Sequence, residues 1–136
     1  MRIYISGKIG RQMPDEATLQ SFAHAEQVLQ AMGFETFNPT TSGLGSTAEI
    51  LSKAGTSLYR EMATREINSY RQRSWYDCIL MLDLEVLSWY DAICMLPGWQ
   101  HSPGACAERA VADAMGLRIY ELTEYDTLVF IRKNEF

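Results

Sequence analysis

An apolar segment followed by a helix-start signal, within Ala92–Glu108, restricts the fold of this 136-residue chain more than any other feature. Ala92–Leu96 (AICML) is short and apolar, as expected for a strand buried inside a sheet. A Pro-Gly pair ends that strand. Ser102 and Pro103 then supply a helix N-cap and a first helical residue. We therefore predict a buried strand that leads into a helix, a typical unit of α/β proteins.

The rest of the chain repeats this alternation of strands and helices. Further strands are expected at Arg2–Ser6, Phe34–Phe37, Leu117–Leu122 and Asp126–Arg132, and helices at Asp15–Gly33, Ser57–Tyr70 and about Ser74–Trp89. Such alternation favours a mostly parallel sheet with right-handed crossovers. We expect one α/β domain over residues 1–136, a flavodoxin-like or Rossmann-like three-layer sandwich. Its four or five strands would have the order 2-1-3-4, perhaps with 5.

Composition excludes several classes of function. A net charge of −5 argues against a nucleic-acid surface, and no apolar run approaches the roughly 20 residues of a membrane span. The three cysteines lack CxxC spacing, which is typical of reduced core residues in a cytoplasmic protein. The two histidines are isolated, so we predict neither a metal site nor a cofactor.

The topology brings two loops together. In the expected strand order, the loop Gly7–Arg11 faces the loop Trp99–Gly104 at the carboxyl edge of the sheet, where ligands of such folds bind. Candidate anion contacts at this edge are the side chains of Lys8, Arg11 and Ser102 and the helix amides at Gly104 and Ala105, with Gly7 and Trp99 nearby. Taken alone, the loop Gly7–Arg11 also fits a tight turn with solvated cations, and the loop Trp99–Gly104 also fits ordinary α/β construction.

Carboxylates accompany this anion pocket. Glu108 lies four residues after Gly104 and shares its helix face, so it should point into the same opening. Tyr4 could hydrogen-bond Glu108 or could simply be a strand aromatic. Asp83 and Asp77 are candidates for a second acid, although either could be solvated, and Asp91 is interpreted as structural. A nucleophilic carboxylate and an acid around a sugar are the groups of retaining glycosyl transfer. The segment Thr40–Thr56 is interpreted as a lid or a mobile loop.

Three sequence segments resemble the nucleoside 2-deoxyribosyltransferase-like proteins, which include the 2′-deoxynucleoside 5′-phosphate N-hydrolases. IYISGKIGR near the N-terminus is similar to the opening strand and glycine loop of that family. DLEVL at Asp83–Leu87 is similar to its acidic helix segment. SPGACAE at Ser102–Glu108 matches its Ser-x-Gly-x-x-x-Glu pattern. The LPGW segment is closer to a little-characterised bacterial and phage branch of this superfamily.

The resemblance implies roles for individual residues. Glu108 would be the nucleophile, Asp83 the proton donor or base contact, and Tyr4 the residue that positions Glu108. A serine at position 102, with Lys8 and Arg11, is similar to members that accept a 5′-phosphate. The implied substrate is therefore a small nucleotide or nucleoside, and the implied assembly is a homodimer or higher homo-oligomer.

Two function classes follow. The first is an N-glycosidase or deoxyribosyltransferase that acts on a (deoxy)nucleoside 5′-monophosphate through a covalent glycosyl–Glu108 intermediate. The alternative is a non-catalytic nucleotide-binding or sensing module with the same pocket. A flavin protein is disfavoured, because the first loop lacks a Ser/Thr-rich phosphate cradle.

Overall fold

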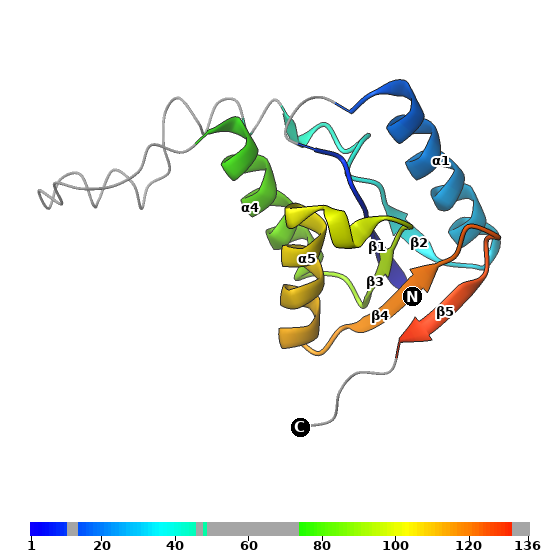
Figure 1. Ribbon diagram of the computed structural model, residues 1–136. Coiled ribbons are helices and arrows are strands. Elements are labelled where there is room, and N and C mark those ends of the chain that lie inside the picture. Colours follow the sequence, from blue (N-terminus) through cyan, green and yellow to red (C-terminus); the bar gives the residue numbers. More distant parts are fainter. Residues whose placement is uncertain (11–13, 46–47, 49–73, 132–136) are drawn as a thin grey trace, which may run out of the picture.

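The computed structural model describes residues 1–10, 14–45, 48 and 74–131. Arg11, the expected helix Ser57–Tyr70, most of the segment Thr40–Thr56 and the C-terminal tail lie outside the described residues. The described part contains three helices and a five-stranded sheet, which belong to the α/β class (Figure 1).

The sheet has the strand order β2-β1-β3-β4-β5. Its strands are β1 (Arg2–Ser6), β2 (Glu35–Phe37), β3 (Ala92–Met95), β4 (Arg118–Leu122) and β5 (Leu128–Ile131). The first four strands are parallel, so the predicted flavodoxin-like order is confirmed. From β1 the chain adds β2 on one side, and it then returns to add β3 on the other side of β1. This reversal of strand order leaves a crevice at the carboxyl ends of β1 and β3.

The fifth strand runs antiparallel to β4. A tight turn joins the two strands, in which Thr123 N–H donates to the Thr127 carbonyl (2.9 Å) and Asp126 has a φ of 60°. A connection this short can only reverse the chain, because a parallel crossover needs a dozen or more residues. The strand expected at Asp126–Arg132 therefore begins two residues later, at Leu128.

Helices cover both faces of the sheet (Figure 1). Helix α1 (Glu16–Ala31) packs Phe22, Ala25 and Leu29 on one face. Helices α4 (Trp75–Leu87) and α5 (Pro103–Ala114) lie on the other, where Leu87, Ala105 and Ala112 join a second core. The three predicted layers are thus present.

Strand alternation in β1 decides which side chains meet α5. Ile3 and Ile5 point to the α1 core, whereas Tyr4 and Ser6 point to the face that α4 and α5 cover. Gly7 follows at the end of the strand, where a Cβ atom would lie 3.1 Å from Leu96 Cβ and 3.2 Å from the Phe22 ring. A residue without a side chain is therefore needed there for the loop to pass close to α1.

Local signals position the two helices of the second face. Ser74 and Asp77 form a reciprocal capping box at the start of α4. Ser102 caps α5, with Pro103 as the first helical residue, as the sequence predicted. Within the described residues, no helix is both long and apolar enough to cross a membrane.

Candidate active site

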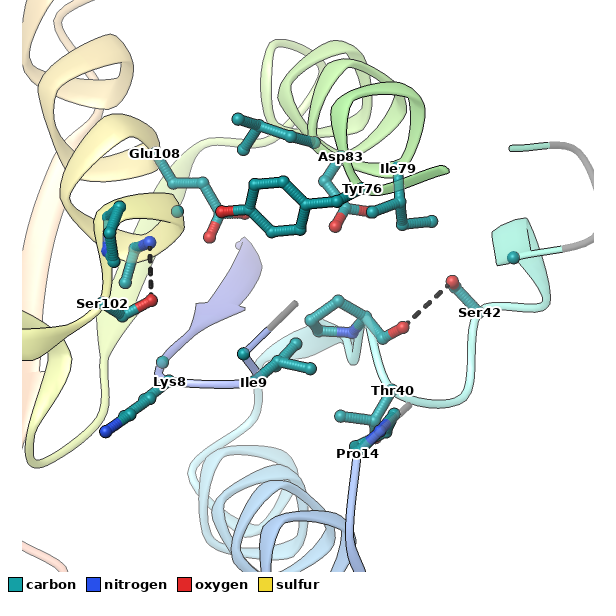
Figure 2. Close-up of a pocket in the computed structure, with 18 of the residues that line it drawn as sticks. Lys8, Ile9, Pro14, Thr40, Ser42, Tyr76, Ile79, Asp83, Ser102 and Glu108 are labelled. Atoms are coloured by element: carbon teal, nitrogen blue, oxygen red, sulfur yellow. Dashed lines mark hydrogen bonds between the residues drawn. The ribbon is translucent and has the colours of Figure 1, made fainter. Parts of the chain in front are cut away.

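A cavity of about 470 Å³ lies at the carboxyl edge of the sheet, between α4, α5 and the loop after β1 (Figure 2). This volume is in the range of small-molecule sites. Among the residues predicted for the site, the cavity lining contains Gly7, Lys8, Asp83, Ser102, Gly104, Ala105 and Glu108. The two loops expected to face each other therefore do so.

Glu108 is the most closely held side chain in this cavity. It is 7% exposed and projects from the second turn of α5. Tyr4 donates a hydrogen bond to Glu108 Oε2, and Ser6 Oγ donates to Oε1 at 3.0 Å. Burial raises the pKa of the Glu108 carboxyl to about 7, although both hydrogen bonds act to lower it. Burial and the nearby carboxylates raise the pKa of Tyr4 well above its usual value, so Tyr4 remains a donor.

Asp83 is the second buried acid of the cavity. It projects from α4 and is 9% exposed. Its Oδ1 atom is buried and finds no hydrogen-bond partner among the described residues. Burial, and then the charge of Glu108, raise the pKa of Asp83 to about 8. Near neutral pH the Asp83 carboxyl is therefore biased toward its protonated form, ready to donate to a ligand.

The first turn of α5 leaves only one of the two amides expected to contact an anion, because the Ala105 amide is already hydrogen-bonded. Ala105 N–H donates to Ser102 Oγ at 3.2 Å, and Cys106 N–H donates to the Ser102 carbonyl at 2.9 Å. Pro103 has no N–H. The Gly104 N–H is the remaining amide of this turn, and it has no hydrogen-bond acceptor among the described residues. The Ser102 hydroxyl accepts the capping bond and keeps its own proton to donate, so Gly104 and Ser102 are the polar groups here suited to an anion.

Tyr76 brings α4 against this helix start. Its ring crosses the cavity toward α5, on the same side as Asp83 and Glu108 (Figure 2). A Cβ atom on Gly104 would lie 3.0 Å from the Tyr76 hydroxyl. The glycine is therefore needed for the close approach of the tyrosine rather than for an unusual backbone conformation.

The remaining wall is largely apolar. Its apolar residues are Trp75, Ile79 and Leu80 from α4, together with Ile9, Pro14 and Pro39. The Trp75 indole N–H donates to the Gly45 carbonyl at 3.0 Å, which ties α4 to the segment after β2. This lining is suited to the faces of a flat apolar ring, and Figure 2 shows the Asp83 carboxylate beside Ile79 on α4, with Glu108 across from it on α5.

Other candidate residues lie farther from the carboxylates. Lys8 is exposed at the rim, and Figure 2 shows its amino end directed away from Glu108 and Asp83. Trp99 is not part of this lining: it borders a separate hollow near β4, and the Arg109 guanidinium lies over its ring at 5.0 Å. Arg11 lies outside the described residues.

The two other acids considered from the sequence have structural roles. Asp77 accepts a hydrogen bond from Ser74 N–H at 2.9 Å in the capping box of α4. Asp91 accepts from Arg2 N–H at 2.9 Å at the opposite end of the sheet from the cavity, in agreement with its structural interpretation. Within the described residues, no cluster of three or more potential metal ligands is present.

Sequence reasoning missed several residues of the site. Ser6 was recognisable, because it lies two residues after Tyr4 and must share its face of β1. Tyr76 lies on the apolar side of the predicted helix at about Ser74–Trp89, but helical spacing does not distinguish a core contact from a cavity wall. His101, Thr40 and Ser42 also line the cavity; they belong to the two segments Trp99–Gly104 and Thr40–Thr56 that the sequence singled out, but their own residue types did not distinguish them.

Comparison with known proteins defines the family. A family model described as "Domain of unknown function (DUF4406)" matches residues 1–121. The chain belongs to this family. The matched range includes all the described residues of the cavity. Comparison with curated proteins gave no significant match.

The fold is shared with a solved structure. It is a 2-deoxyribosyltransferase from the psychrotolerant bacterium Bacillus psychrosaccharolyticus, described as a biocatalyst for the synthesis of antiviral and antitumoral nucleosides. It is 20% identical to this chain, with a TM-score of 0.53, and the likeness covers 89% of this chain and 71% of that one. At this identity the likeness demonstrates a shared flavodoxin-like architecture.

Proposed function

We propose that this protein cleaves the N-glycosidic bond of a (deoxy)nucleoside 5′-monophosphate through a covalent glycosyl–Glu108 intermediate. The observation that carries the proposal is the unequal pair of buried acids in one cavity. Glu108 accepts hydroxyl hydrogen bonds at both oxygens, whereas the Oδ1 atom of Asp83 has no partner among the described residues. The shared fold with a 2-deoxyribosyltransferase supports the same reaction class.

The pair supplies both groups that the reaction needs. The Glu108 carboxylate attacks C1′ of the sugar, and the C1′–N bond breaks with its electron pair going to the base. Asp83 donates its proton to the departing base and becomes a carboxylate. Water or a second base then attacks C1′, displaces Glu108 and returns a proton to Asp83. Water gives hydrolysis, and a base gives transfer.

The rest of the cavity suits the other parts of a nucleotide. The apolar wall of Trp75, Ile79 and Leu80 can pack against a base. Ser102 and the Gly104 amide, at the start of α5, can bind the 5′-phosphate with the help of the helix dipole. The sugar would then lie between them, beside Glu108.

Base release tests the proposal directly. The protein is incubated separately with each dNMP, each NMP and the matching nucleosides, and free base is measured by chromatography. We expect release from at least one monophosphate, and a loss of at least about 1000-fold in Glu108→Gln, which keeps the side-chain volume but cannot act as a nucleophile. A mass increase of one glycosyl phosphate on the Glu108 peptide would identify the intermediate.

Two outcomes oppose the proposal. Release that survives in Glu108→Gln contradicts the covalent mechanism. Tight nucleotide binding with no release by the unmodified protein supports the alternative, a nucleotide-binding or sensing module.

A further inference from the structure

Ser6 holds the Glu108 oxygen that Tyr4 does not reach. It is the last residue of β1 and is fully buried. Its Oγ donates to Glu108 Oε1 at 3.0 Å, while Tyr4 donates to Oε2. Two hydroxyls on one strand face thereby fix the carboxylate at both ends, which restricts its rotation and aims it into the cavity.

Among the described residues, the second acid, Asp83, has no comparable pair of hydroxyl donors. Asp83 faces the cavity from α4, and its buried Oδ1 atom finds no hydrogen-bond partner among the described residues. Among the described residues, the other titratable groups here are Tyr4 from β1, which contacts Glu108, Tyr76 from α4, and Lys8 and His101 at the exposed rim of the cavity. Hydroxyl donors thus favour a negative charge on Glu108, and nothing described here does the same for Asp83 Oδ1.

We propose that Ser6 is a positioning residue that keeps Glu108 ionised and oriented, so that the proton available to the two acids resides on Asp83. This inference rests on the proposed function for its catalytic meaning. It makes Ser6, together with Tyr4, the reason why Glu108 is the nucleophile and Asp83 the acid, although both carboxyl groups are similarly buried.

The hydrogen-bond donors distinguish the two acids energetically. Burial raises the pKa of both carboxyls, but the bonds from Tyr4 and Ser6 oppose that rise for Glu108, whereas the charge of Glu108 adds to it for Asp83. Without the Ser6 hydroxyl, the two acids would become more alike. The proton would then reside on Glu108 more often, and a protonated Glu108 cannot attack C1′.

A titration without substrate tests this inference independently of catalysis. Carboxyl ¹³C NMR follows Glu108 and Asp83 in the ligand-free protein, with Ser6→Ala as the variant, and the two resonances are analysed as a coupled pair. We expect the midpoint of the Glu108 titration to rise by roughly one pH unit in Ser6→Ala. Ser6→Thr keeps a hydroxyl and should leave the midpoint near that of the unmodified protein. Ser6→Cys, a nearly isosteric but weaker donor, should give an intermediate shift.

Kinetics add a second readout. In Ser6→Ala the midpoint of the acidic limb of the kcat/KM profile should move to higher pH, together with the Glu108 titration. The value of kcat should fall about tenfold with little change in KM. An unchanged Glu108 titration in a folded Ser6→Ala or Ser6→Cys protein overturns the inference. If Glu108→Gln still releases base, the proposed function fails instead, and the NMR titration still decides the role of Ser6.

Discussion

At the scale of single residues, the buried acids should make the protein less stable as the pH rises. The pKa of Asp83 is raised to about 8 and that of Glu108 to about 7 in the folded state, so both bind protons that the unfolded chain has released. The stabilising contribution of protonated Asp83 and Glu108 is complete below about pH 4 and is lost as the pH rises to about 8. The free energy of unfolding should therefore fall across this range.

Asp83→Asn tests that dependence, because the amide cannot ionise. Chemical denaturation at several pH values should show that the free energy of unfolding depends less on pH in this variant. At pH 8 the free energy of unfolding should exceed that of the unmodified protein by on the order of 2 kcal/mol. Glu124→Gln, which removes an exposed carboxylate outside the cavity, should keep the unmodified pH dependence. An identical slope in Asp83→Asn would contradict the buried, protonated state of Asp83.

The positions of the acids in the sequence predict one of the two buried acids and not the other. Glu108 was predictable, since its spacing from Gly104 assigns it to the same helix face. The choice of Asp83 over Asp77 from their positions alone was not possible. Their separation of six residues directs them differently around α4. The capping box of Asp77 with Ser74 is local, whereas only packing against the sheet shows that Asp83 is buried at the cavity.

At the scale of elements, Ser102 joins two roles at the start of α5. Its side chain caps the helix by accepting from Ala105 N–H, and its hydroxyl faces the cavity. Ser102→Ala should remove the cap and lower the free energy of unfolding by about 1 kcal/mol. Ser102→Asp should retain a good cap, yet place a negative charge where the phosphate is proposed to bind.

The two variants separate helix capping from phosphate binding. Denaturation should show Ser102→Asp to be close to the unmodified protein in stability. Kinetics should show its KM for a monophosphate raised about tenfold or more, with a smaller change for the matching nucleoside. Equal effects on the nucleotide and the nucleoside would argue that the phosphate binds elsewhere.

The elements themselves were largely predictable. The capping signals of α4 and α5 and the apolar strand β3 depend on neighbouring residues, so the local sequence encodes them. The first turn of α5 shows the limit of that reasoning. The Gly104 and Ala105 amides were both expected to be open to an anion, whereas Ala105 N–H donates to Ser102 Oγ and the Tyr76 hydroxyl of α4 lies against Gly104.

At the scale of the whole molecule, the site exists only when the layers are assembled. Glu108 comes from α5, its two hydroxyl partners from β1, and Asp83 from α4. A ligand of this cavity should therefore bind the folded protein and not the unfolded chain. The expectations of one domain over residues 1–136 and of a homo-oligomer stay predictions.

Ligand-dependent unfolding measures this coupling. In the inactive Glu108→Gln variant, a monophosphate at 100 times its Kd should raise the free energy of unfolding by about 2.7 kcal/mol. Inorganic phosphate alone should give a much smaller shift, because it leaves the apolar wall unoccupied. No change in the melting temperature with millimolar monophosphate would argue against nucleotide binding in this cavity.

The sequence by itself determined the α/β class, the strand order and the approach of the Gly7 and Ser102 loops. These depend on hydrophobic periodicity, caps and the handedness of crossovers, which act over a few residues or follow from chain topology. Only the tertiary structure decided that Ser6 and Tyr4 hold opposite oxygens of Glu108, and that the Oδ1 atom of Asp83 is buried without a partner among the described residues. The reason is physical: burial and the approach of residues about 100 positions apart determine the charge on each acid, and both arise only when the helices pack on the sheet.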